Sequence, residues 1–478
     1  MEMSRRTLLK SSAAGLGVLG ATAIQGFGLT FPAHALGAIA RRGASDGFGP
    51  LEPDPAGILD LPQGFSYSIV TQAGRPLAGQ PTGIVPGRPD GTASFEGPSG
   101  GVLLVNNHEQ GTTATFPAVA DADFVYDPGT TGGTTTILVD RHNNAILEYV
   151  SLAGTFNNCA GGATPWGTWL TCEETEQRAS GAITRNHGYV FEVDPRDRDA
   201  NRNPEPLTGL GRFAHEAAVV DPSRGHVYLT EDANAPNGLL YRFTPHQLPN
   251  GRHTLRGGGV LEAMSIPGVT DLSTFNSIGT ELPVVWKPVP DPSALTKGST
   301  RKQFTYVDLT NRAAPVTVTG EGGDITRSRK FEGQWWGNGR AFIVCSFART
   351  TDSGDWSLGA HDGQVWSYDP GTSTLRLEVF LPLNPDPSGA TADQPDGPDN
   401  ITVNPWGGLF LAEDGEGTQH LVAVSEDGDP FIFARNRASI SEFTGVNFSP
   451  DRQTLFANIQ DEGYVFAITG PFAQFRRS

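Results

Sequence analysis

A repeating pattern of polar and apolar positions runs through most of this chain of 478 residues. Each copy begins with polar residues and passes through small or apolar residues to a turn. It then enters an apolar stretch that ends in acids or other polar groups. Two short strands joined by a turn explain each copy. The copies are Phe95–Glu109, Asn157–Glu174, Ala214–Asp232, Phe331–Phe347, Pro398–Asp414 and Glu442–Asp461.

Four of these copies are followed by a further apolar stretch that begins with glycine. These stretches are Gly188–Pro195, Gly238–Pro245, Gly363–Pro370 and Gly463–Gly470. Repeated units of three or four strands are typical of a β-propeller. The 60 glycines and 36 prolines also favour short strands and turns over long helices. We therefore predict an all-β fold, a six-bladed β-propeller with inter-blade insertions, of which the largest lies between Pro245 and Arg329.

The first 35 residues have the features of a targeting segment. Arg5 and Arg6 are followed by the glycine-rich apolar run Ala13–Ile24 and by a small-x-small cleavage site at Ala33–Ala35. The run is too short and too rich in glycine for a stable membrane anchor. We expect export by the twin-arginine machinery to the periplasm or the cell exterior. The predicted organisation is a signal peptide over 1–35, a lead-in segment over 36–60 and a single β-propeller catalytic domain over 61–478.

The charge balance is strongly acidic. With 34 basic and 52 acidic residues, the formal net charge is −18. The chain has no excess of Lys and Arg to neutralise phosphates, so nucleic acid is excluded as a partner. An acidic surface suits multivalent cations, although solvated surface carboxylates account for most of the charge. We expect a monomer.

Aligning the copies on their turn residue reveals a set of equivalent positions, six residues before each turn. The first strand of each propeller blade lines the central channel, so these side chains should converge on the axis. Converging carboxylates repel one another unless a cation compensates. Oxygen ligands with one thiolate favour iron together with calcium over a closed zinc site. A polar channel that holds only water is the alternative. The positions are Cys159, Glu216, Glu332, Asp399 and Thr444.

A second set of candidates stands where the second strand of each copy ends. These residues are further metal ligands, partners of ligands, or turn formers. The alignment places Cys172 with Glu231, Cys345 and Glu413. A Cys159–Cys172 disulfide is an alternative, but three cysteines cannot all pair, and folding before export disfavours it. The set is His108, Glu109, Cys172, Glu173, Glu174, Glu231, Asp232, Glu413 and Asp414.

Basic residues lie beside one member of the predicted ring, in the stretch Arg327–Gly333. A cation next to a metal cluster would neutralise the phosphoryl oxygens of an anionic substrate. The alternative is a basic loop that faces solvent and balances nearby acids.

Several of these segments resemble the PhoX family of secreted bacterial alkaline phosphatases. The resemblance lies in "NCAGGATPWGTWLTCEE", "FAHEAA", "KFEG" and "PDNITVNPWGGLFLAEDG", behind a twin-arginine signal. It extends over nearly all of the mature chain. It implies a six-bladed propeller, a cluster of two ferric ions (Fe3+) with calcium (Ca2+), and hydrolysis of small phosphomonoesters. It also implies that a metal-bridging oxygen species, rather than a serine, attacks phosphorus.

The resemblance also assigns roles to residues of this chain. The thiolate ligand would be Cys159, with Cys172 as the alternative, and Glu216 and Glu332 would bridge iron. Calcium ligands would come from Glu109, Glu173, Asp399 and Glu413.

One position departs from the family pattern, which has an arginine two residues before the glutamate that corresponds to Glu332. This chain has Lys330 there, with Arg329 beside it. Lysine supplies a charge but not a bidentate fork. We therefore predict that Lys330 or Arg349 steadies the phosphoryl group.

Two other functions remain open from the sequence. The first is a calcium-dependent lactonase or esterase on a similar propeller, for which Asp399 and Asn400 would supply channel ligands. The second is a secreted propeller that acts as a binding scaffold without catalysis. Iron together with calcium favours the phosphatase, whereas calcium alone favours the other two.

Overall fold

The computed structural model describes residues 47–248, 250–308, 314–348 and 361–477. Residues 44–478 form one compact unit. The predicted signal peptide lies outside the described residues. Among those that are described, helical elements are short 3-10 turns, and no helix has the length and hydropathy needed to cross a bilayer.

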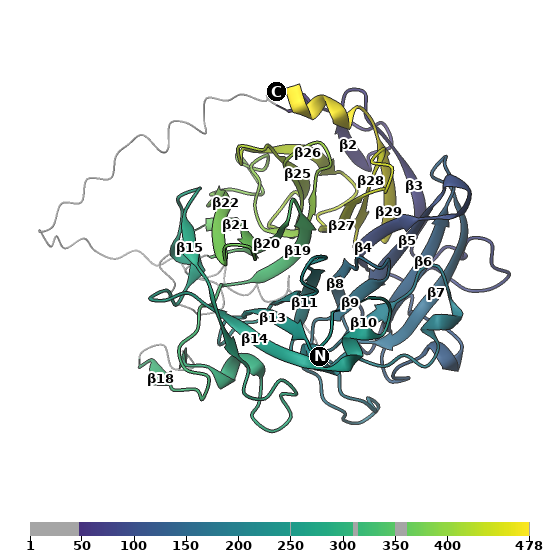
Figure 1. The fold of residues 1–478 in the computed structure, drawn as a ribbon. Coiled ribbons are helices and arrows are strands. Elements are labelled where there is room, and N and C mark those ends of the chain that lie inside the picture. Colours follow the sequence, from purple (N-terminus) through teal and green to yellow (C-terminus); the bar gives the residue numbers. More distant parts are fainter. Residues whose placement is uncertain (1–46, 249, 309–313, 349–360, 478) are drawn as a thin grey trace, which may run out of the picture. The chain divides into compact units, whose positions relative to one another are not determined.

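Six sheets of the described chain form the blades of a β-propeller, which confirms the predicted fold class (Figure 1). Blade 1 contains β4 (Pro89–Glu96), β5 (Val102–His108), β6 (Gly132–Val139) and β7 (Ala145–Thr155). Blade 2 contains β8 (Asn158–Ala163), β9 (Trp169–Glu173) and β10 (Val190–Val193). Blade 3 contains β11 (His215–Val220), β12 (Val227–Glu231), β13 (Leu240–Pro245), β14 (Gly259–Ser265) and β16 (Val285–Pro288).

The remaining three blades follow in chain order, and two of them recruit strands from the N-terminal part of the chain. Blade 4 contains β19 (Phe331–Gly337), β20 (Arg340–Ser346), β21 (His361–Asp369), β22 (Thr374–Pro382) and β15 (Glu281–Pro283). Blade 5 contains β23 (Pro398–Val403), β24 (Leu409–Glu413), β25 (His420–Val424), β26 (Pro430–Asn436), β2 (Leu59–Pro62) and β1 (Leu51–Glu52). Blade 6 contains β27 (Phe443–Phe448), β28 (Thr454–Ile459), β29 (Tyr464–Thr469) and β3 (Ser66–Gln72).

The N-terminal strands close the ring of blades. β3 precedes blade 1 in the chain but pairs antiparallel with β29, so it completes blade 6. β2 pairs with β26, and β1 pairs with β2. The described part of the segment 36–60, which the sequence suggests as a lead-in, therefore contributes β1 and the start of β2 to blade 5. Pairing the two ends of the chain in this way protects sheet edges that would otherwise be exposed.

The stretch between Pro245 and Arg329, predicted as one long insertion, is partly built into the blades. It carries β14 and β16 for blade 3 and β15 for blade 4. It also carries a small hairpin of β17 (Tyr306–Asp308) and β18 (Val316–Val318). Arg301 fastens this stretch to blades 2 and 3, because its Nη1 lies 2.8 Å from carboxylate oxygens of both Glu176 and Glu231.

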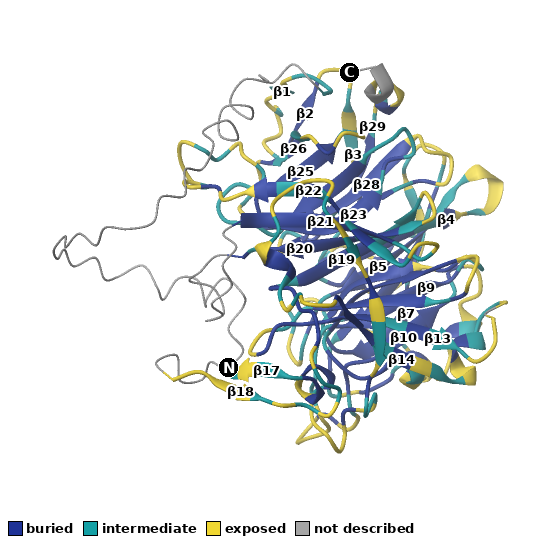
Figure 2. Cartoon of the chain, turned by 60° about the vertical axis from the view of Figure 1, so that its left-hand side comes forward, coloured by how far each residue is buried: buried dark blue, intermediate teal, exposed yellow. Residues whose placement is uncertain are grey.

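Apolar side chains fill the spaces between neighbouring blades, so the strands are buried while turns and insertions are exposed (Figure 2). Between blades 3 and 4, Tyr228, Trp366 and Tyr368 pack together. Phenylalanines do the same near the closure of the ring, where Phe410 and Phe433 make an edge-to-face contact with ring centroids 5.1 Å apart. This packing holds the first strands rigidly around the axis.

Candidate metal centre

The first strands of the six blades pack side by side around the axis in the order β4, β8, β11, β19, β23 and β27, and β27 returns to β4. Each first strand has a shift of register close to its beginning, where it pairs with the second strand of its blade. A β-bulge at such a place bends the strand and redirects its side chains. The second residue of each strand lies at or beside this bulge. In blade order these residues are Asp90, Cys159, Glu216, Glu332, Asp399 and Thr444.

Four of the predicted ring residues come together at this end of the propeller. Among the described residues, three groups of side chains offer ligand atoms that all lie within 4.8 Å of one another. Glu216 belongs to the first and second groups, and Asp399 belongs to the second and third, so the groups form one continuous row. The groups are Cys159, Glu174 and Glu216; Glu216, Glu332 and Asp399; and Asp399, Asp414 and Glu442. We call these seven residues the acidic cluster.

Asp90 is the member of the ring that the turn alignment missed. It lies next to the cluster, with its Oδ2 3.9 Å from the Sγ atom of Cys159. β4 has 8 residues whereas β8 has 6. In blade 1 the ring position therefore lies more than six residues before the turn, and the alignment on the turn residue does not find Asp90. The sequence signal that could have identified Asp90 is the Pro-Asp pair with which both β4 and β23 begin.

Two predicted ligands, Glu173 and Glu413, lie at the ends of second strands and outside the three groups. Glu173 pairs with Asn158, and Glu413 pairs with Pro398, so both are the last residues of their strands in the same register. Their carboxylates bond to backbone N–H groups and histidines, as described below. The neighbouring acids, Glu174 and Asp414, are the ones in the cluster. The structure thus brings together the acid that follows each predicted ligand, because alternate residues of a strand face opposite ways.

Cys172 is also displaced from the position that the alignment gave it. Glu173, not Cys172, has the register of Glu231, Cys345 and Glu413, because these residues pair with the first residues of β8, β11, β19 and β23. Cys172 packs in an apolar core between blades 2 and 3. All three cysteines are free thiols, so the disulfide is absent.

Glu109, the remaining predicted calcium ligand, lies at the border of the cluster. Its Oε2 accepts hydrogen bonds from Arg88 at 2.8 Å and from Gln460 at 2.9 Å. The same amide nitrogen of Gln460 donates to Oδ2 of Asp90 at 2.7 Å. Gln460 follows β28 of blade 6 and therefore connects that blade to both Glu109 and Asp90 of blade 1.

The electrostatics of the cluster favour a bound cation. Burial raises the pKa of Cys159 well above its usual value, and the carboxylates of Asp90 and Glu216 raise it further. Burial likewise raises the pKa of Glu442 well above its usual value, with contributions from Asp414 and Asp90. The Cys159 thiol and the Glu442 carboxyl group would thus retain their protons unless positive charge were supplied. A thiolate among buried carboxylates is a donor set that fits iron and calcium.

Lys330 makes a cationic contact with Glu332 at the edge of the cluster. Its Nζ lies 2.6 Å from Oε1 of Glu332 and 3.8 Å from Oδ2 of Asp232. Its side chain is 28% exposed, so it lies between the cluster and solvent. The neighbouring Arg329 is buried. Arg349, the other predicted phosphate ligand, lies outside the described residues.

Further along the first strands the central channel is nearly filled. The residue after the ring position is glycine in several blades, and a Cβ on Gly91 would lie 2.6 Å from Cα of Ala160 in blade 2. A Cβ on Gly333 would lie 2.7 Å from the carbonyl oxygen of Asp399. The cavity that remains here has a volume of about 20 Å³, enough for about one water molecule. On its inner side the cluster therefore faces a nearly filled channel.

Fold and site together define an all-β propeller protein with a largely buried acidic cluster at one end of its axis. The chain belongs to the alkaline phosphatase PhoX family, which it matches over residues 46–147 and 142–463. This match confirms the resemblance seen in the sequence. The chain has no match among curated proteins.

Solved structures of other proteins are similar to this chain at low identity. The PQQ domain of a pyranose dehydrogenase from Coprinopsis cinerea has 11% identity and a TM-score of 0.38, with 87% of this chain and 98% of that domain covered. A gluconolactonase from Xanthomonas campestris has 13% identity and a TM-score of 0.37, with 84% of this chain and 100% of that chain covered. Likenesses at this level carry no argument about activity.

Proposed function

We propose that the protein is a metal-dependent hydrolase of small phosphomonoesters. The observation that carries the proposal is the acidic cluster itself: a thiol and six carboxylates in one row, four of the seven residues buried and three half-buried, with Lys330 at its edge. Membership of the alkaline phosphatase PhoX family supports the reaction class. A row of this kind has no evident structural purpose, because buried like charges destabilise a fold.

The residues of the cluster fit Fe3+ and Ca2+ in different parts of the row. Cys159, Glu216 and Glu332 would hold iron, since the single thiol lies at that end. Asp399, Asp414 and Glu442 offer only oxygen ligands and would hold calcium. When bound, these ions would neutralise phosphoryl oxygens and activate the water that attacks phosphorus.

The protein side chains around Glu332 would orient both the carboxylate and the substrate. Oε1 of Glu332 accepts a hydrogen bond from Oγ of Ser346 at 2.7 Å, and Nζ of Lys330 lies 2.6 Å from the same oxygen. These two contacts hold the carboxylate in one orientation. With part of its side chain exposed, Lys330 can also donate to a phosphoryl oxygen of a bound ester.

The filled channel determines how substrate approaches. Because the axis beyond Gly91 and Gly333 leaves a cavity of only about 20 Å³, a phosphomonoester would enter from the end at which the first strands begin. The buried floor keeps bulk water from the inner side of the cluster. Charge interactions there are correspondingly stronger than in water.

The hydrogen bonds of Asn400 do not favour the lactonase alternative, which relied on this side chain as a ligand in the channel. Nδ2 of Asn400 donates to Oδ1 of Asp399 at 3.1 Å, and Oδ1 of Asn400 accepts the backbone N–H of Gly445 at 2.6 Å. The amide thus joins blades 5 and 6 and is engaged in structural hydrogen bonds.

We further propose that the chain is exported by the twin-arginine machinery through its segment 1–35 and acts in the periplasm or outside the cell. Folding before export would allow the cluster to be loaded with metal in the cytoplasm.

The decisive experiment is to express the protein with its native export signal, measure iron and calcium per chain, and assay p-nitrophenyl phosphate with and without a chelator. We expect both metals and chelator-sensitive hydrolysis. Calcium without iron, together with lactone hydrolysis, would support the lactonase instead. Metal without any hydrolysis would support a binding scaffold.

A further inference from the structure

Two buried glutamates occupy the same place in blades 2 and 5, yet neither belongs to the acidic cluster. Glu173 ends β9 and Glu413 ends β24, and each pairs with the first residue of the inner strand of its blade. Both are fully buried. The residue that follows each of them, Glu174 or Asp414, is in the cluster.

The carboxylate of Glu173 is held by four donors. Its Oε1 accepts from Nδ1 of His187 at 2.7 Å and from the backbone N–H of Phe156 at 3.0 Å. Its Oε2 accepts from the backbone N–H groups of Gly188 at 2.9 Å and Tyr189 at 3.1 Å. Glu173 thereby connects the end of β9 to the segment before β10 and to the end of β7.

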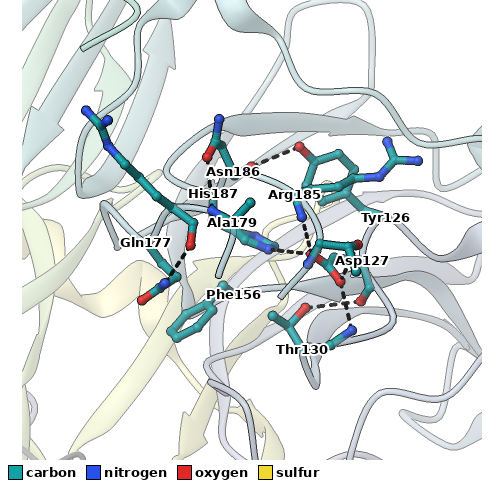
Figure 3. A network of polar contacts seen from close by, with 12 residues as sticks. Tyr126, Asp127, Thr130, Phe156, Gln177, Ala179, Arg185, Asn186 and His187 are labelled. Carbon is teal, nitrogen blue, oxygen red and sulfur yellow. Dashed lines mark hydrogen bonds and ion pairs between the residues drawn. The ribbon is translucent and has the colours of Figure 1, made fainter. Parts of the chain in front are cut away.

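His187 continues this connection into blade 1. Its Nε2 lies 3.5 Å from Oδ2 of Asp127, and its ring lies beside that of Phe156, with centroids 5.7 Å apart (Figure 3). Asp127 accepts in turn from the backbone N–H groups of Gly129, Thr184 and Arg185. The imidazole is therefore fixed between two carboxylates that are themselves fixed by backbone donors.

Blade 5 has the same arrangement with different connecting residues. Oε2 of Glu413 accepts from both Nδ1 and the backbone N–H of His420 at 2.8 Å. Its Oε1 accepts from the backbone N–H of Asp396 at 2.9 Å. The histidine follows its glutamate by 14 residues in blade 2 and by 7 in blade 5, so the pair is preserved although the loops differ.

We propose that His187 and His420 are positioning residues for the metal site: each fixes the glutamate that ends a second strand, and thereby directs the next carboxylate, Glu174 or Asp414, into the acidic cluster. The physical reason is the alternation of side chains along a strand. Once the side chain and backbone of one residue are fixed on the outer side, the next side chain must face the axis. This inference rests on the proposed metal site.

Paired substitutions separate this role from a general need for a buried polar group. Asparagine places its amide nitrogen near the position of Nδ1, so His187→Asn and His420→Asn keep the donor to glutamate. Glutamine places its nitrogen near Nε2, so His187→Gln and His420→Gln lose that donor. His361, which begins β21 and is buried against Phe380, provides the control His361→Gln.

The measurement is the calcium dissociation constant of the chelator-treated, full-length protein, with iron per chain measured on the protein as purified. We expect His420→Gln, whose Asp414 lies at the calcium end of the cluster, to bind calcium about 10- to 100-fold more weakly, which is the usual effect of losing a partner of a ligand. His187→Gln, whose Glu174 lies beside Cys159 at the iron end, should lose iron per chain instead. The Asn variants and His361→Gln should stay within about threefold of wild type, well short of that loss. Equal calcium affinities in the two His420 variants, or equal iron contents in the two His187 variants, whether at the wild-type level or below it, would overturn the inference. If the wild-type chain itself bound no metal, the proposed function would fail instead.

Discussion

The Sγ atom of Cys159 lies 3.2 Å from Oε1 of Glu216, although 57 residues separate them and they belong to adjacent blades. The contact exists because the bulges of β8 and β11 bring the second residue of each strand to the axis. It makes Cys159 the thiol that would bind iron.

Replacing this thiol should therefore remove iron without unfolding the protein. In Cys159→Ser we expect less than about a tenth of the wild-type iron, in line with the loss of a soft ligand, and a matching loss of phosphatase activity. The measurement is metal analysis of purified protein beside the assay. Cys172→Ala is the matched control: it should keep its metals and lose about 1 kcal/mol of stability, because Cys172 only packs in the core. Full iron in Cys159→Ser would contradict the ligand assignment.

The adjacent acids Glu173 and Glu174 should respond in opposite ways. Glu174→Gln relieves repulsion in the cluster, so the metal-free protein should keep its stability while its metal affinity falls. Glu173→Gln puts an NH2 group where the carboxylate accepts four hydrogen bonds, and should cost about 1–3 kcal/mol in the metal-free protein. Urea unfolding of chelator-treated protein measures the stability, and iron per chain of the protein as purified reports the affinity. The same response from both variants would count against the assignment.

Lys330 should act on substrate binding. In Lys330→Met we expect KM for p-nitrophenyl phosphate to rise about 10- to 100-fold, because a charged hydrogen bond to the phosphoryl group is lost. Lys330→Arg keeps the charge and should keep KM at or below the wild-type value. Ser346 still donates to Glu332 in both variants, so metal content should stay close to the wild-type level. An unaltered KM in Lys330→Met would show that other groups bind the phosphate.

Arg301 should be important for stability. Its guanidinium pairs with Glu231, whose carboxylate is fully buried, so Arg301→Met leaves a buried charge without its cation. We expect a loss of about 3–5 kcal/mol in the free energy of unfolding. The exposed neighbouring position provides the control Lys302→Met, which should change stability by less than about 0.5 kcal/mol. Similar melting temperatures for the two variants would refute the anchoring role.

Glu148 should make stability depend on pH. Burial in blade 1 raises its pKa to about 7, although Thr71 donates a hydrogen bond to it at 3.0 Å. In the unfolded chain the same group has a pKa of 4.5. A raised pKa favours the protonated form in the folded state, so this contribution is complete below about pH 4.5 and is lost as the pH rises through about 7.

The variant Glu148→Gln should remove this dependence. We expect it to be about 3 kcal/mol more stable than wild type at pH 9, and equal to wild type at pH 4.5. Melting temperatures across this range provide the measurement. Glu96→Gln, at an exposed end of β4 in the same blade, should follow the wild-type curve. A constant difference between Glu148→Gln and wild type at all pH values would contradict the prediction.

The sequence by itself determined the architecture and much of the site. Each copy of the pattern carries its own two strands and turn, so local alternation was enough to predict six blades. Counting back from a shared turn found Cys159, Glu216, Glu332 and Asp399 because the first strands of blades 2, 3, 4 and 5 reach their turn after the same number of residues.

Only the tertiary structure decided the rest, and in each case the deciding fact was a register or a contact between distant segments. Asp90 was missed because β4 is longer than β8, and Glu442 because it precedes its strand. The choice between Glu173 and Glu174 required the pairing of β8 with β9, since a slip of one residue turns a side chain to the opposite face. The closure of blade 6 by β3 joins residues nearly 400 positions apart, and no local pattern reports such a pairing.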